Sequence, residues 1–409
     1  MEAEKKHQQQ QEEQGENKCL IPGLPDDIGM ECLIRVPHEF HSNMKSVCLK
    51  WQYLISDPSF YHQRLRSNTA EHLVYQIQPT HIMIDDDDVI SSSQKKQKHT
   101  QHNTPPPLQY GLTIYNATYQ TWQRMIPNFE IPIFCQCVTL QSCGNSKLVL
   151  LGGWDPKTLE PVSDVYVLDI IKGWRKGASM SVARSFFACA VVGGTKVYVA
   201  GGHENQKNAL KSAQVYDVDK DEWGVLPEME EERDECMGMC WDDRFWVVSG
   251  YGTETQGRFR SDGECFDPAT ASWSKFHNLW PFQSLSPKYN TTSTRGGKQR
   301  EWLWFLGNEQ QQQQQFEHEE ERRCSIVQLP NSVIGSVSVT TLGLGDHQCN
   351  QKVFVMSGNG SSLKKCNDCE SEGAFILERD TSNGNTKWHH VHTPLAFSGF
   401  PYSTCHLLI

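Results

Sequence analysis

The chain lacks any long apolar run. No stretch of its 409 residues approaches the roughly 18 consecutive apolar residues that a membrane-spanning helix needs. Its first residues, MEAEKKHQQQQEEQGENK, also lack the apolar core of a secretory signal peptide. They are polar and charged, which predicts a disordered tail over residues 1–19. We therefore expect a protein of the cytoplasm, the nucleus or both, with no membrane partner.

The 15 cysteines lack the regular spacing of a disulfide framework. Without a secretory signal, reduced thiols in the core are expected. Cys366 and Cys369 form one pair with the spacing of metal ligands, but a zinc site would need a second pair nearby, and the sequence has none there. Loop cysteines are favoured over a metal site, and no cofactor is expected.

The chain also lacks an excess of positive charge, with 38 basic against 49 acidic residues and a net charge of -11. Proteins that bind nucleic acids concentrate basic residues against the phosphates, so no nucleic-acid partner is expected. The G-x-S-x-G elbow of serine hydrolases is absent. The pair Gly201-Gly202 has no predicted helix after it whose N-terminus could hold a phosphate.

An internal repeat is present instead. KLVLLGGW, KVYVAGGH and RFWVVSGY share an alternating apolar pattern that ends in Gly-Gly or Ser-Gly. A short strand-like segment with an acidic residue follows each of them, and then a tryptophan. Trp174, Trp223 and Trp273 lie 49 and 50 residues apart. A repeat of this length and pattern is typical of kelch β-propellers, which the chain resembles.

Each repeat is interpreted as a four-stranded antiparallel blade. KVYVA alternates as a second strand should, and the glycines end it where the chain bends sharply. AQVYD and EWGVL predict the third and fourth strands, and FFACAVV the first strand of the next blade, beside the central channel. Repetition also assigns structural roles to two arginines and to the three tryptophans between blades: Arg184, Arg233, Trp174, Trp223 and Trp273.

Six blades are predicted over residues 70–409. Second-strand patterns begin at six places: Leu73, Leu148, Val197, Phe245, Trp302 and Val353. The fifth blade keeps only this pattern and should be the weakest. The first blade lacks a first strand of its own, whereas the C-terminal YSTCHLLI resembles one. The expected fold is an all-β kelch propeller in which the C-terminal strand completes the first blade and removes the open edge.

Two segments interrupt the repeat. The one near residues 85–107 mixes charge, serine and proline, and the one near 308–322 is rich in glutamine and acid. Both lack an apolar period, which predicts disordered insertions. The aspartate run at 85–88 lacks the glycine placement and final glutamate of a calcium loop, so a solvated loop is preferred.

Residues 20–66 predict a small α-helical module ahead of the propeller. Pro25 suits a first helical position, and the two aspartates after it suit a first turn. Pro37 should stop this helix, and Asp57-Pro58 the next one. The apolar faces expected on the two helices are Ile28, Cys32, Leu33 and Val36 on the first, and Met44, Val47, Cys48, Trp51, Leu54 and Ile55 on the second.

LPDDIGMECLIRVP, VCLKW and LISDPSF in this module resemble an F-box. A module this small cannot bury its apolar stripe fully. Part of the stripe therefore needs a partner surface. The resemblance implies docking on a Skp-type adaptor and, through it, a cullin; a helical cap on the propeller is the alternative. It assigns the adaptor-binding or internal apolar face, without separating the two roles, to Leu24, Pro25, Ile28, Leu33, Val47, Cys48 and Trp51.

An F-box followed by kelch repeats resembles the plant F-box/kelch proteins. YGLTIYNATYQTWQRMIP, LVLLGGWDP and SVARSFFACAVV are similar to the group linked to turnover of phenylalanine ammonia-lyase and of type-B response regulators in cytokinin signalling. The resemblance implies a non-catalytic substrate receptor of a Skp–cullin–F-box ubiquitin ligase. Such a subunit acts by holding a target protein near the ubiquitin-conjugating enzyme.

Two other functions stay open at this point. One is a kelch scaffold with no part in ubiquitination. The other is a copper enzyme similar to galactose oxidase, which would need a secreted context and two histidine ligands with tyrosines at one end of the propeller. The positions equivalent to His203 hold Trp154, Tyr251 and Asn308, so the repeat supplies no second histidine there.

The residue after each glycine pair opens the loop between second and third strands. Repetition therefore predicts a ring at one end of the propeller, made of Trp154, His203, Tyr251, Asn308 and Asn359. We expect these side chains to bind the protein substrate, because aromatic groups serve as rigid anchors and His and Asn as adaptable hydrogen-bonding partners. The alternative is that each one only covers its own blade.

Overall fold

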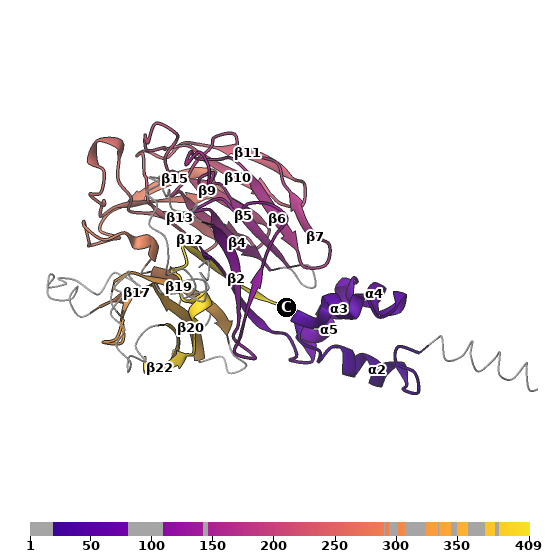
Figure 1. Ribbon diagram of the computed structural model, residues 1–409. Helices are drawn as coiled ribbons and strands as arrows, with labels where there is room; N and C mark the ends of the chain where they lie inside the picture. Colours follow the sequence, from indigo (N-terminus) through magenta and orange to yellow (C-terminus); the bar gives the residue numbers. More distant parts are fainter. Residues whose placement is uncertain are drawn as a thin grey trace, which may run out of the picture.

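A computed structural model describes residues 19–80, 109–141, 146–289, 291–293, 302–307, 324–333, 335–344, 350–358, 373–380 and 384–409. In Figure 1 the strands form one body, and a group of short helices packs against it near the C-terminus. The predicted insertions, the cysteine pair and residues 1–18 lie outside the described residues.

Six sheets form the blades of a β-propeller, as predicted. The first blade consists of β1 (His72–Pro79), β2 (Tyr110–Asn116), β3 (Thr121–Met125) and β23 (Ser403–Leu408). The second consists of β4 (Gln136–Leu140), β5 (Lys147–Leu151), β6 (Val165–Asp169) and β7 (Gly173–Lys176). The third consists of β8 (Ala188–Val192), β9 (Lys196–Ala200), β10 (Ala213–Asp217) and β11 (Glu222–Leu226). The last three are β12 (Met237–Trp241), β13 (Arg244–Val248), β14 (Gly263–Asp267) and β15 (Ser272–Phe276); β16 (Thr291–Ser293), β17 (Trp302–Leu306) and β18 (Cys324–Gln328); and β19 (Val337–Leu344), β20 (Asn350–Ser357), β21 (Ala374–Asp380) and β22 (Thr386–Val391). Short 3-10 turns are η3 (Thr253–Thr255), η4 (Pro287–Tyr289) and η5 (Leu395–Phe397).

The C-terminal strand closes the propeller. β23 pairs antiparallel with β1, from His72 opposite Leu408 to Ile77 opposite Ser403. The inner strands then contact one another around the channel in the order β23, β4, β8, β12, β16, β19 and back to β23. The predicted closure is confirmed, because the contacts between inner strands run all the way around the channel.

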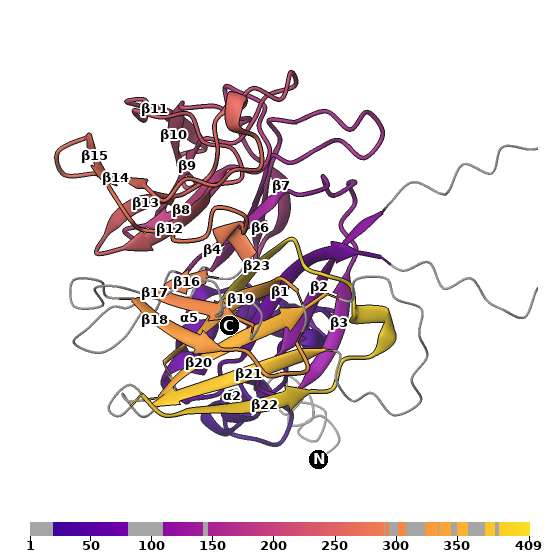
Figure 2. The same ribbon diagram turned by 90° about the vertical axis from the view of Figure 1, so that its left-hand side faces the viewer.

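The fifth blade departs from the expected antiparallel pattern. In the part that the structure describes it contains β16, β17 and β18, and β17 pairs antiparallel with β16 but parallel with β18. The expectation of an antiparallel third strand is therefore wrong here. A parallel neighbour needs a longer connection than a hairpin, and the chain between Leu306 and Cys324 is long enough to supply one. The turned view of Figure 2 shows this sheet beside the regular sixth blade.

Glycine pairs end the second strands because the backbone there passes very close to the connections that lead into inner strands, as the pair Gly201-Gly202 shows. Gly201 and Gly202 have φ angles of +70° and +82°. A Cβ on Gly202 would lie 2.4 Å from the carbonyl oxygen of Ser185, and one on Gly201 would lie 2.4 Å from that of Arg233. Only glycine satisfies both the left-handed conformation and the contact.

We expect Gly202→Ala to lower the free energy of unfolding by about 2–4 kcal/mol, from left-handed strain plus overpacking. Gly194→Ala is the matched control, because Gly194 has a φ of +76° but no atom within 4 Å of its added Cβ. The control should lose about 1 kcal/mol from strain alone. Urea unfolding measures both variants, and equal losses would contradict the role of the close contact.

The N-terminal module consists of short helices: α2 (Asp26–Leu33), η1 (His38–Phe40), α3 (His41–Lys45), α4 (Leu49–Ile55) and α5 (Pro58–Arg66). The expected second helix is wrong as a continuous element, because the chain breaks between α3 and α4. Cys48 is extended there, with φ -160° and ψ 162°. The break divides the predicted stripe: Met44 and Ile55 are buried, whereas Val47 and Cys48 are exposed.

The predicted face of the first helix is divided in the same way. Leu33 is buried, whereas Ile28 and Cys32 on α2 are exposed. The module and the propeller share one apolar core, in which Leu33, Phe60 and Tyr61 join a cluster that includes Leu73 of β1 and Leu407 of β23. The helices are therefore held to the first two blades by packing as well as by the chain.

Candidate functional site

The helical module carries several exposed apolar side chains, and these are the first candidates for contact with a partner. Ile28 is 48% exposed and Val47 is 62% exposed. Pro25 and Cys48 are also exposed, and Leu24 is half-buried. Soluble proteins tend to cover large apolar groups, so a concentration of exposed ones marks an interaction site.

The other two predicted F-box residues have internal roles. Leu33 is 2% exposed and belongs to the shared core. Trp51 is half-buried and its Nε1 donates a hydrogen bond of 2.7 Å to the carbonyl oxygen of Leu20. The structure thus separates candidate contact residues from internal ones, which the sequence pattern alone did not.

Sequence reasoning missed three further exposed groups in the module: Phe40, Leu49 and Tyr53, which are 46%, 68% and 72% exposed. Together with Ile28 and Val47 they are five of the twelve exposed large apolar side chains of the described chain, so the module holds more than its share. Leu49 and Tyr53 follow the break at Cys48, and a turn there is what brings them to the surface.

A second candidate surface lies at the end of the propeller where the glycine pairs occur. Trp154, His203 and Tyr251 occupy the same place in three successive blades, where their backbones bridge to Ile133, Ser185 and Asp234. The repeat therefore places these three predicted residues as expected. Asn308 and Asn359 lie outside the described residues, so the complete ring stays a prediction.

Within this surface the structure brings Trp154 and His203 into contact. Trp154 Nε1 donates to His203 Nε2 at 3.3 Å, and His203 Nδ1 lies 2.9 Å from both carboxylate oxygens of Asp234. Because Nε2 accepts from the indole, the ring proton sits on Nδ1 and is donated to Asp234. His203 thus links Trp154 of the preceding blade to Asp234 of the connection into the next blade.

Burial changes the roles expected for two members of the ring. His203 is 4% exposed and Tyr251 is 5% exposed, whereas Trp154 is only half-buried. Tyr251 donates its hydroxyl to Glu235 Oε1 at 3.0 Å. These two side chains support the surface from below, and Trp154 presents its ring more openly, with Lys207 Nζ 3.6 Å from the ring centre.

Two aromatic residues that the sequence reasoning did not select complete this surface. Phe134 and Phe186 each lie two residues before an inner strand, β4 and β8, and have φ angles of +58° and +54°. Phe186 stacks on His203 with ring centres 5.6 Å apart, and Phe134 meets Trp154 edge-on at 5.2 Å. Bulky residues in left-handed conformation are strained and cluster at binding sites. Their equal distance from the inner strands was visible in the repeat and could have indicated them.

Comparisons with known proteins identify both parts of the chain. The F-box domain profile matches residues 21–63, and the Kelch motif profile matches residues 184–230. The chain is 43% identical to the F-box/kelch-repeat protein SKIP20 of Arabidopsis thaliana, over 94% of this chain and 95% of that one. It is also 43% identical to the Arabidopsis F-box/kelch-repeat protein At2g44130, over 94% of each chain.

The chain belongs to the plant F-box/kelch-repeat family. An F-box joined to a kelch propeller implies a substrate receptor of the SCF type in a non-catalytic adaptor role, with a Skp-type adaptor on the F-box and a protein substrate on the propeller. Among the described residues, no group of three or more His, Cys, Asp or Glu is arranged to hold a metal ion, and no helix is long and apolar enough to cross a membrane.

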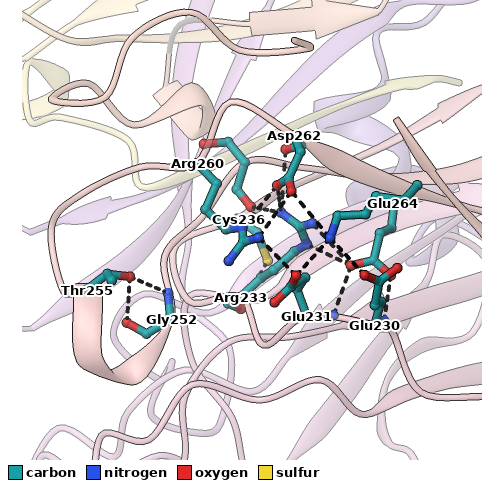
Figure 3. A network of polar contacts seen from close by, with 11 residues as sticks. Glu230, Glu231, Arg233, Cys236, Gly252, Thr255, Arg260, Asp262 and Glu264 are labelled. Atoms are coloured by element: carbon teal, nitrogen blue, oxygen red, sulfur yellow. Dashed lines mark hydrogen bonds and ion pairs between the residues drawn. The ribbon is translucent and has the colours of Figure 1, made fainter. Parts of the chain in front are cut away.

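The repeated arginines of this F-box/kelch-repeat protein are buried and connect neighbouring segments through hydrogen bonds. Figure 3 shows the network around Arg233. Arg233 donates from Nη1 to the carbonyl oxygen of Ser249 and to Asp262, both at 2.9 Å, and from Nε and Nη2 to Glu264 at 3.1 Å. Arg184 donates instead to neutral groups, the carbonyls of Gly201 and Ser212. Burial lowers the pKa of Arg184 to about 10.

The predicted inter-blade tryptophans lie on outer strands and are half-buried against the core clusters. Trp223 Nε1 donates to the carbonyl oxygen of Ala178 at 2.8 Å, and Trp273 Nε1 to that of Pro227 at 2.7 Å. Each bond reaches the connection from the preceding blade. These tryptophans therefore fix one blade to the next, as the repeat predicted.

The inner strands enclose a channel cavity of about 330 Å³. Its walls include the thiols of Cys137, Cys189, Cys236 and Cys405 from four neighbouring blades. Burial raises the pKa of Cys236 to about 11, and it raises that of Cys405 as well, so these thiols are protonated at neutral pH. The reactive form of cysteine is the thiolate, so these two thiols are in their less reactive form.

Proposed function

We propose that this protein is the substrate-recognition subunit of a Skp–cullin–F-box ubiquitin ligase that directs phenylpropanoid enzymes or cytokinin response regulators to the proteasome. The F-box captures the Skp-type adaptor through Ile28, Val47 and their exposed neighbours. The propeller end around Trp154 receives the target, in the cytoplasm, the nucleus or both. The protein itself makes and breaks no bond, and contributes effective concentration and orientation.

The observation that carries the proposal is the exposed apolar surface of an F-box that shares a core with the propeller. Ile28 and Val47 are 48% and 62% exposed, and apolar side chains this exposed indicate a partner surface. The F-box match indicates that this partner is a Skp-type adaptor. Because the helices pack on the first two blades, a target on the propeller would be held at a set position relative to the adaptor. The identity of the target rests on sequence similarity alone.

We expect the double variant Ile28→Asp/Val47→Asp to lose capture of a purified Skp-type adaptor, because a charge in an apolar interface must be desolvated without a partner. Leu24→Ala/Pro25→Ala should weaken capture as well. In plant cells the double variant should lengthen the lifetime of phenylalanine ammonia-lyase. Pull-down and a cycloheximide chase measure the two effects.

Val225→Asp is the matched control, because Val225 is 85% exposed on β11, away from the F-box. Capture that is equal in all variants would contradict the F-box surface and favour a scaffold without a ubiquitin role. Lost capture with an unchanged lifetime of phenylalanine ammonia-lyase would keep the ligase function but remove this enzyme as the target.

A further inference from the structure

An amine lies at the aromatic end of the channel with no acidic partner. Lys288 belongs to η4 and lines the channel cavity of about 330 Å³. Its Nζ lies 5.2 Å from the ring centre of Phe186. Among the described residues no carboxylate forms an ion pair with it, and burial lowers the pKa of the amine.

The two carboxylates whose charges act on Lys288 belong to Asp234 and Glu235, and both form hydrogen bonds with other groups. Asp234 accepts from His203 Nδ1 and, at 2.8 Å, from the backbone N–H of Glu235. The Glu235 carboxylate accepts from the Tyr251 hydroxyl. Burial raises the pKa of Glu235. The amine of Lys288 is therefore left as a donor directed to the cavity.

The chemistry of the amine defines the ligand that fits it. Lys288 Nζ is a donor only, so its complement is a group that accepts hydrogen bonds. A carboxylate is such a group, and it forms stronger bonds because it is charged.

A continuous aromatic cluster lies beside this amine. Phe186 meets Phe134 at 4.9 Å, Phe134 meets Tyr402 at 4.7 Å, and Tyr402 meets Phe400 at 5.6 Å. A peptide whose carboxylate reaches Lys288 would place its neighbouring apolar residues on these rings.

We propose that the channel mouth binds an acidic segment of the target protein, with the carboxylate of one internal Asp or Glu on Lys288 and the flanking apolar residues on the neighbouring aromatic rings. The inference rests on the proposed function, in which this end of the propeller receives the target. It adds the chemistry that the target must present.

The test uses the full chain bound to its Skp-type adaptor and a library of random peptides displayed on phage. Peptides selected on the wild-type protein should carry Asp or Glu at one fixed position between apolar residues. For the best synthetic peptide, Lys288→Met should raise the dissociation constant about tenfold or more, because a charged hydrogen bond is lost. Lys288→Arg should keep most of the affinity, as should Lys196→Met, a change of an exposed lysine at the far end of β9.

Replacing the fixed Asp or Glu of the peptide by Asn or Gln should weaken binding as much as Lys288→Met does, and amidating the peptide's C-terminus should have no effect. Selection without acidic enrichment, or equal affinity for wild type and Lys288→Met, would overturn the inference. So would a strong effect of amidation, which would point to a chain end. Adaptor capture is measured on the same samples, so retained capture shows that the ligase function stands even where the inference fails.

Discussion

Replacing Arg64 by methionine is expected to lower the free energy of unfolding by about 3–5 kcal/mol, because it leaves the carboxylate of Glu71 buried without its charge partner. Both side chains are completely buried. Arg64 Nη2 donates to Glu71 Oε1 at 2.5 Å, and Nη1 donates to the carbonyl oxygens of Ile34 and Val36 at 2.7 Å. One guanidinium thus donates both to the carbonyl groups that follow α2 and to Glu71, which lies between α5 and β1.

Glu71 extends this network into the propeller. Its Oε2 accepts from Asn116 Nδ2 of β2 at 2.6 Å, and its Oε1 accepts from the backbone N–H of His38 at 2.7 Å. Its backbone exchanges two hydrogen bonds with Ile409, which follows β23. Loss of Arg64 should therefore loosen the F-box from the strand that closes the propeller.

Guanidinium chloride unfolding measures the loss, and limited proteolysis between α5 and β1 reports the loosened F-box. Arg66→Met is the matched control, because Arg66 is exposed on the same helix. The control should stay within about 0.5 kcal/mol of wild type. Equal stability of the two variants would show that the buried pair does not hold the F-box in place.

Arg233→Met is expected to lower the free energy of unfolding by about 3–5 kcal/mol, since Glu264 would stay buried without its charge partner, while Asp262 would keep its pair with Arg260. Arg184→Met is the comparison within the chain. Arg184 occupies the equivalent position but donates to neutral oxygens, so its loss leaves no buried charge behind and should cost about 1–3 kcal/mol. A larger loss for Arg184→Met would contradict the electrostatic explanation.

Arg233→Met should also change how the free energy of unfolding depends on pH. Burial alone would raise the pKa of Asp262, but hydrogen bonds from Arg260 and the charge of Arg233 outweigh it and lower the pKa from 3.8 to about 2. A carboxyl with a lowered pKa stabilises the fold above its unfolded pKa, and this stabilisation is lost as pH falls through the folded value. The stability gap between wild type and Arg233→Met should therefore narrow as pH falls from about 4 toward 2.

The candidate site could be predicted only in part. Repetition located Trp154, His203 and Tyr251 at equivalent positions, because a repeat fixes where each residue sits in its blade. It could not show that His203 would be covered by Trp154 from the preceding blade and by Phe186 from the connection into its own blade, since both contacts depend on how separate segments pack. Lys288 lies in the irregular chain before the fifth blade, where no repeat pattern marks it.

The sequence by itself determined the six blades, their closure by the C-terminal strand and the helical module ahead of them. Alternating apolar residues, glycine pairs and a period near 50 are local properties, and each blade follows from its own segment. Tertiary structure alone decided the break between α3 and α4, the parallel pairing of β18, the Arg64–Glu71 link and the unpaired amine at the channel mouth. These features depend on which groups meet across blades and on what is left without a partner there, and contacts between segments far apart in the chain leave no period in the sequence.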